Sequence, residues 1–125
     1  MASSILGKLG IGRRREEAPA TGPQSTDVIS LYLARAKANP NDVQAHFNLG
    51  SAYFVQGKLG EALQELRAVL AVAPEHYDAH YHLGLVYAQL GDLEQAGREF
   101  RLVIEGSPNQ MLKDYAKRKL AALGG

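Results

Sequence analysis

Four histidines near the middle of the chain are the residues best suited to chemistry: His46, His76, His80 and His82. His76 and His80 are four residues apart, a spacing that places two imidazoles on one side of a helix, as in many zinc sites. The sequence contains no cysteine, and no third ligand accompanies the pair at a matching distance. His46 and His80 hold the same position in two similar segments. We therefore expect them to pack against the next helix, and we predict no metal site and no cofactor.

Other catalytic patterns are also missing from the sequence. No serine or threonine stands in a nucleophile motif, and no glycine-rich phosphate loop is present. The segment GKLG at residues 57–60 fits the turn of a helical hairpin. A formal net charge of +1 is too small to favour nucleic-acid binding across the whole surface. We therefore predict a protein without enzyme activity and without a nucleic-acid partner.

The elements that must position these histidines recur at a fixed spacing, which we call the repeat period. HFNLGSAYFVQGKLGEAL begins at His46, and HYHLGLVYAQLGDLEQAG begins one repeat period later at His80. The same spacing separates Pro40 from Pro74 and Pro108, Gly50 from Gly84, and Gly57 from Gly91. Because proline marks helix junctions and glycine ends helices, each period predicts two helices joined by a tight turn. The predicted helices are 26–38, 42–56, 59–72, 76–90, 93–106 and 109–123, the first with Ser25 or Thr26 as its N-cap.

Gly50 and Gly84 fall inside predicted helices, where glycine costs about 1 kcal/mol relative to alanine. Their recurrence at the same phase indicates that the paired helix crosses too closely for a side chain. We expect the small side chains of Ala62 and Ala96 to face these two glycines.

The repeated segment resembles the tetratricopeptide repeat, a helix–turn–helix unit whose length matches the repeat period. The matching residues are Leu49, Gly50, Tyr53, Gly57, Ala62 and Pro74 in the first copy, and Leu83, Gly84, Tyr87, Gly91, Ala96, Phe100 and Pro108 in the second. His46 and His80 stand where the family pattern has tryptophan. The resemblance implies an all-α fold, a right-handed α-solenoid of about six helices in antiparallel pairs. It covers 26–123: a half-repeat at 26–42, repeats at 43–76 and 77–110, and a polar capping helix at 109–123.

The resemblance also implies a concave groove, lined by the first helix of each unit. Counted onto this chain, the groove positions are Gln44, Phe47, Ser51, Phe54, Val55, Asp78, Tyr81, Leu85, Ala88, Gln89, Leu112, Tyr115 and Lys119. Their apolar character favours a site for an apolar peptide or amphipathic helix of a protein partner. The alternative is that residues such as Phe47 and Leu85 pack between units. Phe47 and Ser51 replace the lysine and asparagine with which chaperone-binding members clamp a terminal carboxylate, so that clamp is absent.

Residues 1–25 differ from the repeats. Apolar residues come first and a basic cluster follows: Ile5, Leu6, Leu9 and Ile11, then Arg13, Arg14 and Arg15. Residues 12–25 are rich in proline and glycine, which predicts a linker. The segment is either a tolerated disordered tail or a docking segment that folds on a partner, on the first helix or on an anionic membrane surface.

The predicted function is a non-enzymatic protein–protein interaction module, an adaptor or scaffold or an accessory subunit of a larger assembly. One alternative is a membrane-peripheral assembly factor whose residues 1–15 contact lipid or a membrane complex. A second is a homo-oligomer in which the first helix stacks on another copy. The sequence lacks a convincing signal peptide and a membrane-spanning run of about 20 apolar residues. We therefore expect a cytoplasmic location, or an association with a membrane complex under the first alternative.

Overall fold

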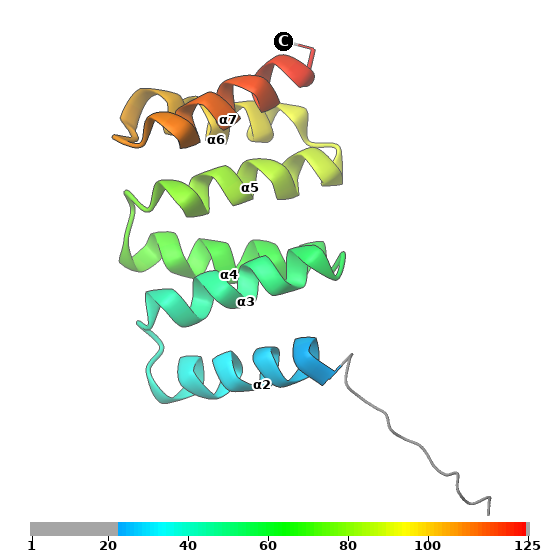
Figure 1. Ribbon diagram of the computed structural model, residues 1–125, viewed down its shortest axis with the longest axis vertical. Coiled ribbons are helices and arrows are strands. Elements are labelled where there is room, and N and C mark those ends of the chain that lie inside the picture. Colours follow the sequence, from blue (N-terminus) through cyan, green and yellow to red (C-terminus); the bar gives the residue numbers. More distant parts are fainter. Residues whose placement is uncertain (1–22, 125) are drawn as a thin grey trace, which may run out of the picture. The chain divides into compact units, whose positions relative to one another are not determined.

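The computed structural model describes residues 23–124, and all regular structure in that range is helical. In chain order the helices are α2 (Pro23–Ala38), α3 (Val43–Val55), α4 (Leu59–Val72), α5 (Tyr77–Leu90), α6 (Leu93–Gly106) and α7 (Gln110–Ala122) (Figure 1). The all-α prediction is confirmed, and the predicted ends of the last five helices agree to within one residue. The chain divides into two units between Leu31 and Tyr32, and α3 to α7 lie in the second.

Helix α2 begins earlier than predicted. Its first residue is Pro23, three residues before the predicted start, so Ser25 and Thr26 lie inside the helix and do not cap it. The prediction was wrong because it took Pro23 as part of the linker. Proline is tolerated in the first turn of a helix, where its missing N–H would have no partner in any case.

The helices from α3 onward pack in sequence (Figure 1). Helix α3 packs on α4, α4 on α5, α5 on α6 and α6 on α7. Contacts also join α3 to α5 and α5 to α7. Because alternate helices touch, α3, α5 and α7 form one continuous face, which we call the α3–α5–α7 face.

Side chains cap the start of four helices, where backbone N–H groups lack helical partners. The capping residues are Asp42 for α3, His76 for α5, Asp92 for α6 and Asn109 for α7. Asp42 accepts a hydrogen bond from the Ala45 amide at 3.0 Å, and this bond lowers the pKa of Asp42. The guanidinium of Arg35 also donates to Asp42, at 3.1–3.3 Å, and ties the end of α2 to the start of α3.

Glycine ends α3 and α5, as predicted. Gly57 and Gly91 have φ angles of +78° and +85°, in the left-handed region that side chains disfavour. The backbone amide after each glycine donates a hydrogen bond to a carbonyl of the helix that has just ended. Lys58 donates to the Tyr53 carbonyl and Asp92 to the Tyr87 carbonyl, both at 2.9 Å. These turns bring α4 back along α3 and α6 back along α5.

The predicted close approach at Gly50 and Gly84 is confirmed, and the nearest atoms belong to a larger side chain of the paired helix. A Cβ atom at Gly50 would lie 2.9 Å from the Leu66 side chain and 3.6 Å from the Ala62 carbonyl. At Gly84 it would lie 2.5–2.8 Å from the ring of Phe100. Leu66 and Phe100, each one turn after the alanine of its helix, pack against Gly50 and Gly84. The alanines themselves are buried, and the backbone of Ala62 lies against Gly50 as expected.

The hydrophobic core joins both repeats. Its largest fully buried side chains are Leu49, Leu66, Val69, Val86, Phe100 and Val103. Leu112 and Ala116 of α7 are buried against the same core, so α7 covers the last pair of helices. No helix within residues 23–124 is long and apolar enough to cross a bilayer.

We expect Gly84→Ala to lower the free energy of unfolding by about 1–3 kcal/mol, since the new methyl group overpacks against Phe100. Gly60→Ala is the matched control. A Cβ at Gly60, in the first turn of α4, meets no atom within 4 Å, so this change should raise stability by about 0.4–1 kcal/mol. Urea denaturation followed by circular dichroism measures both. Equal effects of the two substitutions would contradict the close approach at Gly84.

Candidate binding groove

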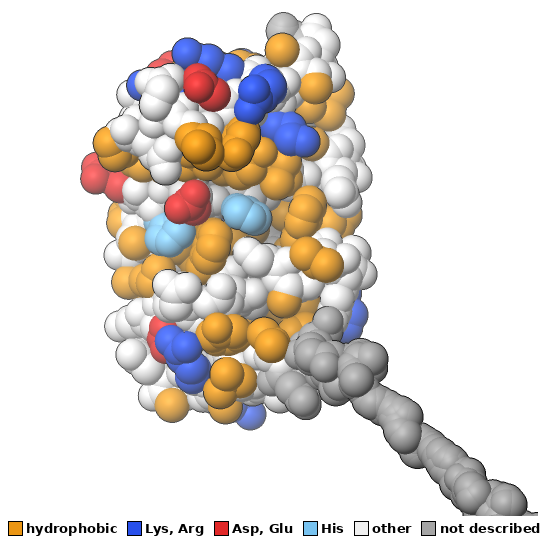
Figure 2. Space-filling view, in the orientation of Figure 1, with side chains coloured by type: hydrophobic (Ala, Val, Ile, Leu, Met, Phe, Trp, Pro, Cys, Tyr) orange, Lys and Arg blue, Asp and Glu red, His pale blue; other side chains and the backbone are white. Residues whose placement is uncertain are grey.

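Aromatic residues at one repeat position form a series across the α3–α5–α7 face. Phe47, Tyr81 and Tyr115 follow one another at the repeat period and come from α3, α5 and α7. The rings of Tyr81 and Tyr115 lie 6.4 Å apart between centroids. The ring of His82 lies between Phe47 and Tyr81, with centroid distances of 5.1 Å and 5.9 Å. Partial burial raises the pKa of Tyr81. Figure 2 shows apolar side chains and histidines together on the surface of the helical stack.

An apolar pocket of about 460 Å³ opens between α3, α5 and α7. Its lining residues are Phe54, Leu85, Ala88, Gln89, Phe100, Lys119, Ala122 and Leu123. Five of these belong to the predicted groove positions: Phe54, Leu85, Ala88, Gln89 and Lys119. The structure therefore brings residues from three successive repeat units to one pocket, which we call the apolar pocket.

The other predicted groove residues are more dispersed. Gln44 lies at the start of α3, and Ser51 is half-buried. Val55 is 84% exposed, and neither it nor Ser51 lines the apolar pocket. Leu112, which the groove positions also include, is buried in the core. Phe47 and Leu85 each pack one side against the core, as the alternative of packing within the fold expects.

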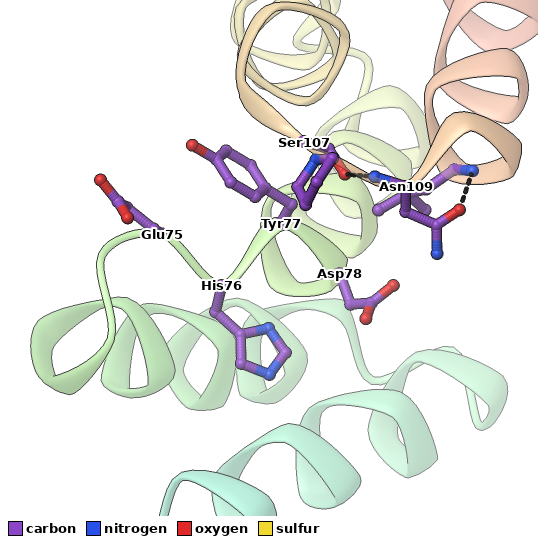
Figure 3. A pocket seen from close by; sticks show the side chains of 8 residues that line it. Glu75, His76, Tyr77, Asp78, Ser107 and Asn109 are labelled. Atoms are coloured by element: carbon purple, nitrogen blue, oxygen red, sulfur yellow. Dashed lines mark hydrogen bonds between the residues drawn. The ribbon is translucent and has the colours of Figure 1, made fainter.

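Asp78 lies in a second pocket of about 450 Å³, at the turns before α5 and α7 (Figure 3). Three of its polar side chains accept hydrogen bonds from the local backbone. The Ser107 hydroxyl accepts from the Asn109 amide at 3.0 Å, and Asn109 accepts from the Leu112 amide at 3.1 Å. His76 accepts from the Ala79 amide at 3.1 Å through Nδ1. Helix capping therefore accounts for His76 and Asn109 at this pocket.

His46 and His80 do more than pack against a helix. His46 Nδ1 lies 2.8 Å from Glu65 Oε1, and its Nε2 lies 2.7 Å from the Pro40 carbonyl. His80 repeats the arrangement, at 2.7 Å from Glu99 and 2.9 Å from the Pro74 carbonyl. We call each set a histidine bridge, because it joins the turn before a first helix to the second helix of the same pair.

The two acceptors require both ring nitrogens to donate. A carbonyl oxygen and an ionised carboxylate can only accept hydrogen bonds. The protonated ring, the imidazolium, is therefore the form that makes both bonds. The hydrogen bond to Glu99 raises the pKa of His80 against partial burial. Burial opposes the charge of His46 most strongly, but the bonds to Glu65 and the Pro40 carbonyl outweigh it and raise its pKa as well.

The possible zinc pair does not form a site. Both nitrogens of His80 are engaged in its bridge, and Nδ1 of His76 accepts from the backbone. Across residues 23–124, no group of three histidine, cysteine or acidic side chains is arranged to hold a metal. The predicted N-terminal docking segment, Ile5 to Arg15, lies outside the described residues.

A family model described as "Tetratricopeptide repeat" matches residues 29–71 and 56–110. Together the two matches cover well over half of the chain. The chain belongs to the tetratricopeptide repeat (TPR) family. TPR units are generally protein–protein interaction modules and are typically non-catalytic. No curated protein matches the sequence.

Solved TPR structures share this fold. The TPR domain of P58(IPK) has a TM-score of 0.75 at 22% identity, over 82% of this chain and 28% of that chain. YrrB, described as a TPR protein with an unusual peptide-binding site, has a TM-score of 0.69 at 32% identity, over 76% of this chain and 49% of that one. MamA has a TM-score of 0.66 at 23% identity, over 81% and 67%. The TPR chain thus spans less than half the length of the first two.

Several residues near the TPR groove were missed by sequence reasoning. His76 and His82 pack on Phe47, with ring centroids 5.0 and 5.1 Å away. Phe100 lines the apolar pocket from α6, and Ala122 and Leu123 line it from the end of α7. Ala122 lies one repeat period after Ala88, so the repeat itself could have identified it.

Proposed function

We propose that the protein is a non-enzymatic adaptor or accessory subunit that binds an apolar peptide or helix of a protein partner on the α3–α5–α7 face. The apolar pocket is the observation that carries this proposal. Phe54, Leu85 and Lys119 line it from three different helices, and the aromatic series extends apolar surface beyond it. Largely preformed apolar pockets of this size are typical binding sites. The peptide-binding site described for YrrB, a chain similar to this one, adds support.

The test begins with the intact chain as bait in cells of its source, with bound partners identified by mass spectrometry. Affinity for the purified partner is then measured by calorimetry for Leu85→Gln/Tyr115→Ser. This variant changes the pocket and the aromatic series at residues that are half-buried or exposed. We expect binding to weaken at least about tenfold, since central apolar anchors dominate interface energies.

Leu102→Gln is the matched control. Leu102 is an apolar residue of α6, partly exposed and outside the apolar pocket. It should leave the affinity unchanged. Equal affinities of the intact chain and the pocket variant, with both folded by circular dichroism, would overturn the proposal.

The membrane-peripheral and homo-oligomer alternatives remain predictions. The first depends on residues 1–15, which lie outside the described part of the chain. Deleting residues 1–12 separates the three functions. A groove adaptor keeps its partner, a membrane-peripheral factor loses co-sedimentation with anionic vesicles, and a self-associating protein changes its mass in solution.

A further inference from the structure

Lys119 gives the apolar pocket one charged side chain. It lies in the last turn of α7 and lines the pocket with seven other described residues, of which only Gln89 is polar. A lysine can bury its aliphatic stem along apolar surface while its ammonium stays in water. The pocket therefore combines an apolar interior with a cationic group in its wall.

The rest of α7 adds to this positive charge. The helix carries four basic residues, Lys113, Lys117, Arg118 and Lys119, against one acidic residue, which gives a net charge of +3. The carboxylate of that acidic residue, Asp114, accepts a hydrogen bond from Gln110. Among residues 28–124, whose side chains the structure describes, none of the four ion pairs found involves a basic residue of α7. Figure 2 shows basic side chains gathered over α7, beside apolar ones.

The other two helices of the face do not balance this charge. Helix α3 contains no lysine, arginine, aspartate or glutamate. Helix α5 contains only Asp78, which lines the other pocket. The α7 side of the face is therefore cationic, and a cationic surface selects partners with the opposite charge.

Two of the basic residues lie on the binding side of α7. Residues three and four apart are neighbours on a helix, so Arg118 and Lys119 share a side with Tyr115. The Arg118 guanidinium lies over the Tyr115 ring, 5.2 Å from its centroid. Lys117 is two residues from Tyr115, on a different side of the helix, and does not line the apolar pocket.

We propose that the partner segment is acidic as well as apolar, with an aspartate or glutamate side chain next to the apolar residue that fills the pocket. The carboxylate would pair with Lys119, beside Arg118. This inference rests on the proposed function and specifies its ligand. The aromatic series continues the apolar surface past the pocket, so the bound chain extends beyond it. For this reason we assign the carboxylate to a side chain and not to a chain terminus.

A random library of 16-residue peptides displayed on phage, selected on the full chain, tests this proposal. The enriched peptides are synthesised with amidated C-termini, and their affinities are measured by fluorescence anisotropy. We expect enriched peptides to contain acidic residues beside apolar ones. Lys119→Glu replaces the attraction by a repulsion between like charges and should weaken their binding about tenfold. Lys117→Glu changes the net charge equally on the same helix and should weaken it about twofold or less.

The outcomes separate this inference from the proposed function. If Leu85→Gln weakens binding but the peptides lack acidic residues, or if both lysine variants behave alike, the inference is wrong and the groove function stands. Binding only by peptides with free C-termini would overturn the side-chain assignment. A library without enriched peptides, or binding indifferent to Leu85→Gln, would count against the proposed function itself.

Discussion

Phe100→Ala is expected to lower the free energy of unfolding by about 3–5 kcal/mol, as large-to-small changes of buried aromatic residues do. Phe100 is fully buried, its ring fills the space over Gly84, and it packs 5.7 Å from the ring of Tyr81. Single domains have a total stability of about 5–15 kcal/mol, so this one change removes a large part of it. Thermal and urea denaturation followed by circular dichroism measure the loss.

Two further variants make this prediction specific. Leu102→Ala changes a residue of the same helix that is 43% exposed, and it should alter stability far less than Phe100→Ala. Phe100→Leu introduces the residue that the first repeat has at the equivalent position, Leu66, and should recover part of the loss. If Phe100→Ala costs no more than Leu102→Ala, the ring does not hold the second repeat together.

The second prediction is a loss of stability as the pH rises above about 6.5, the ordinary pKa of histidine. The folded-state pKa values of His46 and His80 are raised, so folding favours the protonated rings. Their contribution is complete below the unfolded pKa and is lost as the pH rises through the folded pKa. Each bridge contains a charge-assisted hydrogen bond worth about 1.5–3 kcal/mol. Urea denaturation from pH 5.5 to 9 measures the change.

The double variant Glu65→Gln/Glu99→Gln tests whether the histidine bridges cause this pH dependence of stability. A glutamine can donate its amide N–H to Nδ1 while Nε2–H still donates to the proline carbonyl, so the neutral ring satisfies every group. We expect this variant to be less stable than the native chain at low pH and to lose most of the pH dependence. Asp42, which lies near His46, retains its charge over this pH range because its pKa is lowered. An unchanged pH profile in the variant would show that the bridges do not control it.

Much of the fold could be predicted because its signals recur at fixed spacing. Gly57 and Gly91 were predicted to end helices, and both adopt the left-handed conformation that makes them do so. The start of α2 was not predicted, because Pro23 is compatible with a linker and with the first turn of a helix. Local sequence does not distinguish the two.

The candidate site was only partly predictable. The repeat phase placed Phe54, Leu85 and Lys119 among the groove positions, and all three line the apolar pocket, but it could not show that Val55 lies apart from it. The histidine bridges depend on contacts between helices, which repeat phase alone does not specify. A signal was present nonetheless. Glu65 and Glu99 are separated by one repeat period, as the two histidines are.

Each histidine bridge begins and ends within a single stretch of chain, from Pro40 to Glu65 and from Pro74 to Glu99. A duplication of one whole repeat period inside the array would therefore copy a complete bridge and break none. The array can therefore grow by whole units, each with a complete histidine bridge between the turn before its first helix and its second helix.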